Sequence, residues 1–220
     1  MNYFVVFDFE TDGVDPNICQ PVQIAAILVD PYNLEPIDSS VFCSDMKPEG
    51  IDNEEYFTDK INNTIKWHSE NQGVKPEDII KRWKESPPQK MVWKNFVQHI
   101  NKYNKKKTQT GTPVACGMNI RNFDLPIANR LNKLYNVSRL FNYEVVDLRD
   151  LFFYSLLWDV EVNSRSLDNM RKYFGLSNKN AHDALQDVRD ETAFITRYLK
   201  YFKNVFNKGN PYKGCMKSVA

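Results

Sequence analysis

The residues most able to do chemistry in this sequence are four carboxylates, two of which stand together near the N-terminus. Asp8 ends an apolar run over residues 3–7, and Glu10 follows two residues later. Because side chains alternate along a strand, we expect both carboxylates to point to the same side of a sheet. Each buried carboxylate at such a strand end needs a cation or a hydrogen-bond donor. Asp8 and Glu10 are therefore candidate metal ligands.

The other two carboxylates lie far along the chain, beside predicted helices. Asp124 stands where a predicted strand passes into a helix. Asp187 lies on the last predicted helix, five residues after His182. Residues 178–180 are typical of a loop, which favours a place for His182 at the helix entry. The four carboxylates offer hard oxygen ligands without a Cys pair or paired His, which favours Mg²⁺ or Mn²⁺ over Zn²⁺.

This set of residues fits phosphodiester hydrolysis with two metal ions. Two divalent cations can stabilise both the attacking and the leaving oxygen of a phosphoryl displacement. His182 has the unperturbed pKa that suits a general base near neutral pH. Taken singly, each residue has a plainer interpretation: Asp124 can cap its helix, and Asp187 can be a solvated acid. The prediction depends on the whole set.

A calcium loop is the competing interpretation of the first motif. Asp8, Glu10, Asp12 and Gly13 match the start of an EF-hand. That loop needs a bidentate Glu at its twelfth position, which here is Cys19, and a helix before it. Residues 3–7 instead predict a strand, so the EF-hand is disfavoured.

Hydrophobic periodicity predicts an α/β fold that brings these residues to one place. Three strands that follow one another closely predict an antiparallel meander, and two later strands, each followed by a helix, predict a parallel pair beside it. The predicted strands cover 3–7, 22–29, 39–43, 113–117 and 143–146, and the predicted helices cover 59–68, 76–83, 87–103, 125–135, 148–158, 166–174 and 181–202.

The composition fits one packed domain. The chain has 220 residues, of which 42% are hydrophobic and 26% charged, with a net charge of +1. Such a balance does not predict a strongly basic protein that wraps duplex nucleic acid. We predict a single domain over 1–206 and a flexible tail over 207–220. The sequence shows no signal peptide or membrane-spanning segment, so we expect a cytoplasmic location, or the host cytoplasm for a viral protein.

The four cysteines predict neither a zinc site nor disulfides. They are widely scattered, and no two have the spacing of zinc ligands. We expect them to be reduced and to serve as small core side chains. They are Cys19, Cys43, Cys116 and Cys215.

Three motifs in order resemble the DEDDh exonucleases, the DnaQ-like branch of the ribonuclease-H-like superfamily. Residues 8–13 read Asp-Phe-Glu-Thr-Asp-Gly, residues 119–125 read Asn-Ile-Arg-Asn-Phe-Asp-Leu, and residues 182–187 read His-Asp-Ala-Leu-Gln-Asp. Each is similar to one of the family's three motifs, and the likeness covers about residues 3–202. Met118 departs from the family pattern, because many members carry His before this Asn.

The resemblance implies a five-stranded mixed sheet with flanking helices, and roles for individual residues. Asp8, Glu10, Asp124 and Asp187 would hold two Mg²⁺ or Mn²⁺ ions, and His182 would accept the proton of the attacking water. Thr11, Asp12 and Asn119 would contact the substrate. Trp67 is a candidate for stacking against unpaired bases, although a core position is the favoured interpretation.

The implied activity is 3′→5′ exonuclease action on single-stranded or frayed ends, with DNA favoured and nucleoside 5′-monophosphates released. The substrate partner would be a nucleic acid with a free 3′ end. A polymerase or another replication protein is a further candidate partner. Two alternatives stay open: an RNA-trimming enzyme of the same family, and a non-catalytic nucleic-acid-binding module on the same fold.

Overall fold

A five-stranded sheet forms the centre of the computed structural model, which describes residues 1–106, 109–162, 164–177 and 183–210. The strands lie in the order β3-β2-β1-β4-β5. The first three pair antiparallel, and β4 and β5 continue the sheet in parallel beside β1, so the predicted mixed sheet is confirmed. The strands are β1 (Phe4–Thr11), β2 (Pro21–Val29), β3 (Phe42–Asp45), β4 (Val114–Gly117) and β5 (Val145–Asp147).

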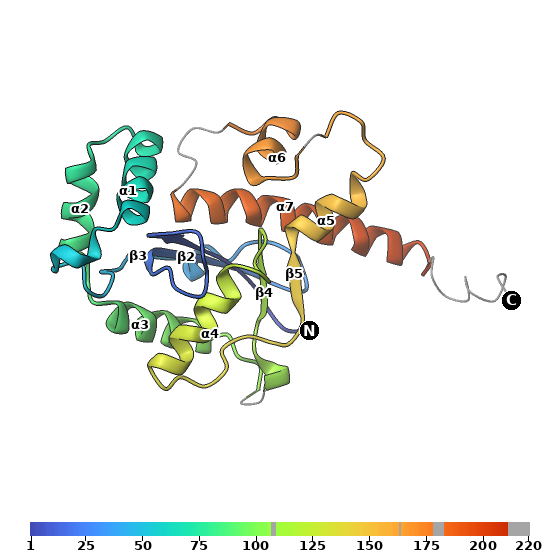
Figure 1. The fold of residues 1–220 in the computed structure, drawn as a ribbon. Helices are drawn as coiled ribbons and strands as arrows, with labels where there is room; N and C mark the ends of the chain where they lie inside the picture. The colour runs from blue at the N-terminus through green and yellow to red at the C-terminus, as the bar shows by residue number, and fades with distance from the viewer. Residues whose placement is uncertain (107–108, 163, 178–182, 211–220) are drawn as a thin grey trace, which may run out of the picture.

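Helices cover both faces of this sheet (Figure 1). On one face α3 and α4 pack against a core that includes Phe7 and Phe96. On the other face α5, α6 and α7 pack against a core that includes Val6 and Ile195. The helices are α1 (Asp59–Gln72), α2 (Pro76–Glu85), α3 (Gln89–Asn101), α4 (Asp124–Leu134), α5 (Leu148–Ser155), α6 (Leu167–Tyr173) and α7 (Ala184–Asn207), with 3₁₀ helices η1 (Asp38–Ser40), η2 (Glu54–Tyr56) and η3 (Gln109–Gly111).

The alternation of β1 decides which way its acids point. Val5, Phe7 and Phe9 all enter the core on the α3 and α4 face. The residues that alternate with them, Val6, Asp8 and Glu10, therefore point to the opposite face, where α7 crosses β1 and β2. The antiparallel register of β1 and β2 shifts between Glu10 and Thr11, directly after the second carboxylate. Such a bulge bends the strand and redirects the side chains that follow it.

The α1–α2 hairpin stands at the β2 and β3 side of the sheet and has a small core of its own (Figure 1). Gly73 ends α1 in the left-handed conformation, with φ 65°, which glycine adopts without a Cβ clash. Pro76 begins α2, where its missing N–H leaves no hydrogen bond unmade. The side chains of Ile65, Ile79 and Trp83 are buried between the two helices and the start of β2.

Several predicted boundaries and burials are wrong in detail. The strand predicted over 39–43 is displaced, because 38–40 form η1 and β3 begins at Phe42. The helix predicted over 148–158 ends at Ser155, and the last helix begins at Ala184 and continues to Asn207. Cys19 and Cys116 are buried as predicted, but Cys43 is exposed because β3 is an edge strand.

The predicted domain boundary at 206 falls in the last turn of α7, and the division into domain and tail stays a prediction. Residues 211–220, with Cys215, lie outside the described residues. Within the described part of the chain, no helix combines the length and apolarity needed to cross a bilayer.

Candidate active site

Three of the predicted ligands meet at the end of β1. One carboxylate oxygen from each of Asp8, Glu10 and Asp187 lies within 4.8 Å of the other two. β1 supplies the first two from one face, and the first turn of α7 supplies the third. Gln23, which pairs with Glu10 across the sheet, accepts a hydrogen bond from the backbone N–H of Ala184 at 2.9 Å. That bond fixes the start of α7 beside Glu10.

Asp124 joins the same site from the other side of β1. Its carboxylate accepts a hydrogen bond from the backbone N–H of Phe9 at 3.1 Å, and its side chain is buried. The plainer interpretation as a helix cap is wrong, because Asp124 is the first residue of α4 and its side chain is turned to β1. It lies near enough to Asp8 to raise the pKa of that carboxyl.

A fifth carboxylate, Glu191, belongs to the same cluster and was not predicted. It lies one turn after Asp187 on α7, and 1% of its surface is exposed. Its Oε1 accepts a hydrogen bond from the backbone N–H of Met118 at 3.2 Å, whereas its buried Oε2 has no hydrogen-bond partner among the described residues. The sequence carried a signal: Glu191 stands between Val188 and Ile195 on the buried stripe of the helix.

The electrostatics of the cluster are unfavourable without a cation. Burial raises the pKa of Asp8 well above its usual value, and the neighbouring carboxylates raise it further. Burial, and then the charge of Asp187, raise the pKa of Glu10 to about 8. Burial also raises the pKa of Asp124 to about 7, and that of Glu191 well above its usual range. Clustered carboxylates with raised pKa values and an unpartnered buried oxygen are a donor set that fits divalent cations.

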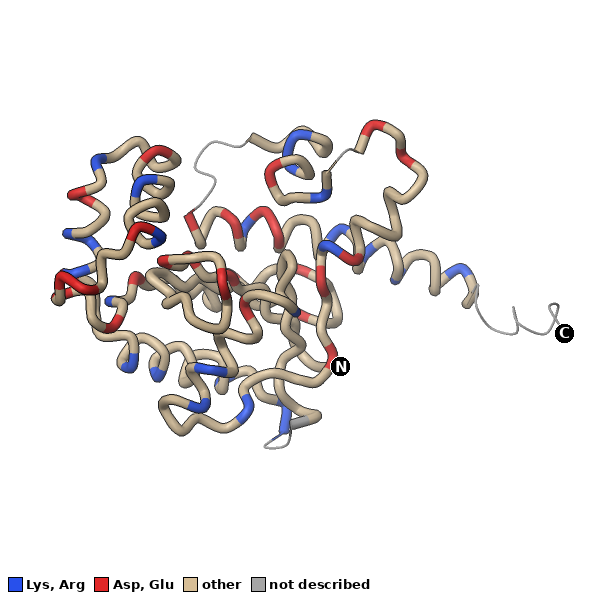
Figure 2. The backbone as a smooth tube through the Cα atoms, in the orientation of Figure 1, with Lys and Arg blue, Asp and Glu red and all other residues tan. Residues whose placement is uncertain are grey.

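One buried arginine compensates part of this charge. Arg171 on α6 is 1% exposed, and its guanidinium donates to Asp187 Oδ1 at 2.7 Å, to Asp190 Oδ2 at 2.7 Å and to Asp168 Oδ1 at 3.0 Å. A planar guanidinium can bond several carboxylates at once and so fixes the orientation of Asp187. Figure 2 shows acidic positions along the first half of α7, the half that lies beside α6.

The β1–β2 turn is held by internal bonds. The Asp12 carboxylate accepts hydrogen bonds from the Gln20 backbone at 2.6 Å and from the Tyr56 hydroxyl at 2.7 Å. The Thr11 hydroxyl donates to the carbonyl of Gly13 at 2.6 Å. Asp12 thus shapes the turn with its side chain, and its predicted contact with substrate stays a prediction.

Two histidines stand differently with respect to the site. His68 on α1, which the sequence did not single out, is buried with Nε2 2.9 Å from the Thr11 carbonyl and Nδ1 3.9 Å from Glu10 Oε2. His182, the predicted general base, lies outside the described residues. Trp67, beside His68, is 42% exposed, so the favoured core interpretation is wrong.

Asn119 begins the loop that leads to Asp124. It adopts the left-handed conformation, with φ 55°, which Asn tolerates better than most residues. Its backbone N–H donates to Asp147 Oδ1 at 2.9 Å, and its side-chain oxygen accepts from Asn122 at 3.1 Å and from Arg149 at 3.3 Å. Asp147 also accepts from the Arg121 backbone, so it ties this loop to the end of β5.

Comparison with solved structures finds this arrangement of strands and helices in nucleases. The chain matches Escherichia coli exonuclease I in complex with a dT13 oligonucleotide at a TM-score of 0.67 and 20% identity, over 96% of this chain and 44% of that one. It matches cell-death related nuclease 4 (CRN-4) at 0.67 and 18%, over 91% and 64%. It matches exonuclease I from Methylocaldum szegediense at 0.66 and 19%, over 94% and 42%. This chain shares the fold of these nucleases.

The likeness lies in the fold, because the sequences have diverged widely. No protein-family model matches the chain, and no curated protein matches it by sequence. The chain spans less than half the length of the exonuclease I structures and 64% of CRN-4. The predicted fold is confirmed by these structures, and in this chain the acidic cluster lies at the end of β1, the central strand of the sheet.

Proposed function

We propose that the protein is a two-metal 3′→5′ exonuclease that acts on single-stranded or frayed 3′ ends, with DNA favoured, and releases nucleoside 5′-monophosphates. The observation that carries this proposal is the convergence of Asp8, Glu10 and Asp187 within 4.8 Å. The likeness in fold to an exonuclease I in complex with a dT13 oligonucleotide supports it. A polymerase or replication partner stays a prediction.

The chain's own residues divide the work of the proposed reaction. Asp8, Glu10, Asp124 and Asp187 would hold two Mg²⁺ or Mn²⁺ ions, which supply Lewis acidity and neutralise charge on the phosphate. Arg171 keeps Asp187 aimed at the cluster. His182 would accept the proton of the attacking water.

The turn after β1 accounts for the proposed polarity. Thr11 and Asp12 directly follow Glu10 and are fixed by Gly13, Gln20 and Tyr56. In the proposed reaction this turn would stop the strand after one terminal nucleotide, which would place the free 3′-hydroxyl against it. The Thr11 and Asp12 backbone and the Thr11 side chain would contact this nucleotide.

Digestion of end-labelled oligonucleotides tests the proposal. A 5′-labelled single strand should shorten stepwise from its 3′ end in Mg²⁺ or Mn²⁺, and matched RNA and duplex substrates report the preference. Asp8→Asn should lower the rate by at least about a hundredfold, since one oxygen ligand becomes an amide. Glu77→Gln, an exposed acid on α2, is the matched control. The absence of shortening at every metal concentration would contradict the proposal.

A further inference from the structure

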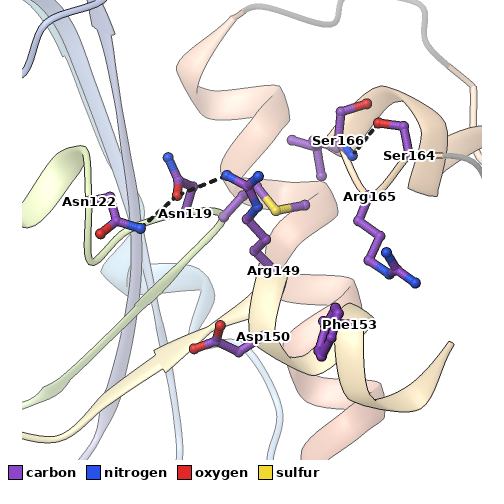
Figure 3. A pocket seen from close by; sticks show the side chains of 10 residues that line it. Asn119, Asn122, Arg149, Asp150, Phe153, Ser164, Arg165 and Ser166 are labelled. Atoms are coloured by element: carbon purple, nitrogen blue, oxygen red, sulfur yellow. Dashed lines mark hydrogen bonds between the residues drawn. The ribbon is translucent and has the colours of Figure 1, made fainter. Parts of the chain in front are cut away.

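A basic pocket of about 680 Å³ lies beside the acidic cluster, between the loop before α4, helix α5 and the start of α6 (Figure 3). Its walls include Met118, Asn119, Asn122, Arg149, Phe153 and Arg165. In Figure 3 the two asparagines stand on one side, Arg165 and Phe153 on the other, and Arg149 reaches between them towards Asn119.

The pocket offers donors and an aromatic face together. The Arg165 guanidinium lies over the Phe153 ring at 5.2 Å, and the ring is 43% exposed. Arg149 is exposed and donates to Asn119 Oδ1 at 3.3 Å. The acidic lining residue is Asp150, whose carboxylate lies 3.8 Å from Arg121 Nε and is offset by it. The pocket therefore favours an anion that carries a ring able to stack.

The pocket and the β1–β2 turn flank the cluster on opposite sides. Met118 and Asn119 border the pocket, and Met118 donates its N–H to Glu191 of the cluster. These residues follow β4, on one side of β1, whereas Thr11 and Asp12 lead towards β2, on the other side. A strand whose terminal nucleotide lies at the turn can therefore continue past the cluster towards the pocket.

We propose that this pocket binds the single strand upstream of the scissile phosphate, with Arg149 and Arg165 on backbone phosphates and Phe153 under a base. This inference rests on the proposed function and names the second contact region of the same substrate. The chain needs a local attraction of this kind, because its net charge is +1 and the cluster itself repels phosphates. Stacking on an aromatic ring holds any base, so the pocket selects single strands without selecting sequence.

Two substrates separate the pocket from the reaction centre. Thymidine 5′-(p-nitrophenyl phosphate) has a cleavable phosphodiester but no upstream nucleotide, whereas a dT12 oligonucleotide has eleven. Arg149→Gln and Arg165→Gln should each raise KM for dT12 about tenfold more than KM for the ester, since each removes one charged phosphate contact. Lys94→Gln, which removes an exposed charge on α3, is the matched control. Equal effects on both substrates, or no effect on dT12, would overturn the proposal.

A binding measurement keeps the test separate from catalysis. Fluorescence anisotropy of labelled dT12 in EDTA needs no hydrolysis, so it still reports on the pocket if neither substrate is cleaved and the proposed function fails. The Arg149→Gln/Arg165→Gln double variant should bind dT12 less tightly and reduce the slope of log K against log salt by about 1.4, or 0.7 for each lost phosphate contact. An unchanged affinity and slope would overturn the proposal even for an active enzyme.

Discussion

Individual buried carboxylates are the electrostatically unfavourable groups of the cluster. Glu10 and Asp124 are buried next to other acids, with pKa values raised to about 8 and about 7. One carboxylate oxygen of Glu191 accepts a backbone N–H, and the other has no hydrogen-bond partner in the part of the chain that the structure describes. Each of these groups holds its proton more tightly in the folded chain than in the unfolded chain. Folding therefore opposes ionisation at this site until cations bind.

The pH dependence of stability follows from those raised pKa values. Where the folded state binds more protons than the unfolded state, the free energy of unfolding falls as pH rises. In EDTA we expect the stability to be greatest near pH 5 and to fall by a few kcal/mol up to about pH 8, through the pKa of Glu10. Urea unfolding across this range measures it.

Two variants make the pH test specific. Glu10→Gln should remove only the part of the fall that Glu10 contributes, because the amide does not ionise while the other buried carboxylates still do. Glu77→Gln on the surface of α2 should leave the fall unchanged. A metal-free stability that rises between pH 5 and 8 in the wild-type protein would contradict the electrostatic account of the cluster.

A buried arginine links helices α6 and α7. Arg171 is the residue of α6 that bonds Asp187 and Asp190 of α7, and it also bonds Asp168 of its own helix. A buried charge that loses its partner costs several kcal/mol, because water no longer solvates it. The short helix α6 thus contributes to the site through Arg171, although none of its residues is a proposed metal ligand.

Arg171→Met should destabilise the metal-free protein by about 3–5 kcal/mol, since it leaves two mostly buried carboxylates of α7 without their cation. Arg171→Lys should restore only part of this stability, because an ammonium group does not reproduce the planar fork. Chemical denaturation gives both values. Saturating Mn²⁺ should offset part of the loss in the Met variant, and a variant as stable as the wild type in EDTA would contradict the anchoring role.

Bound divalent cations should stabilise the folded state of the whole molecule, because they would link segments that are far apart in the sequence. The proposed ligands come from β1, α4 and α7. A ligand at a hundredfold its dissociation constant stabilises the folded state by about 2.7 kcal/mol. We expect EDTA to lower Tm and Mn²⁺ to raise it, as measured by thermal unfolding. Asp8→Asn should greatly reduce this response, and an equal response in wild type and variant would place the bound metal elsewhere.

The sequence predicted what local spacing controls and missed what tertiary packing controls. Alternation along β1 was enough to place Asp8 and Glu10 side by side. Periodicity alone does not bring residues of α4 and α7 to one strand, so Asp124 and Asp187 were predicted from the order of the motifs. Glu191 and Arg171 were missed, since an acid or a base on an amphipathic helix is usually solvated. Trp67 was misjudged because the helical pattern does not reveal which stripe of α1 meets the domain.

The spread of the cluster along the chain sets the order in which its carboxylates appear during synthesis. Asp8 leaves the ribosome well before Asp187, which lies on α7. A nascent chain that has not yet exposed α7 contains both strand carboxylates and lacks their partners. The proposed cutting activity is thus withheld from any product that ends before α7.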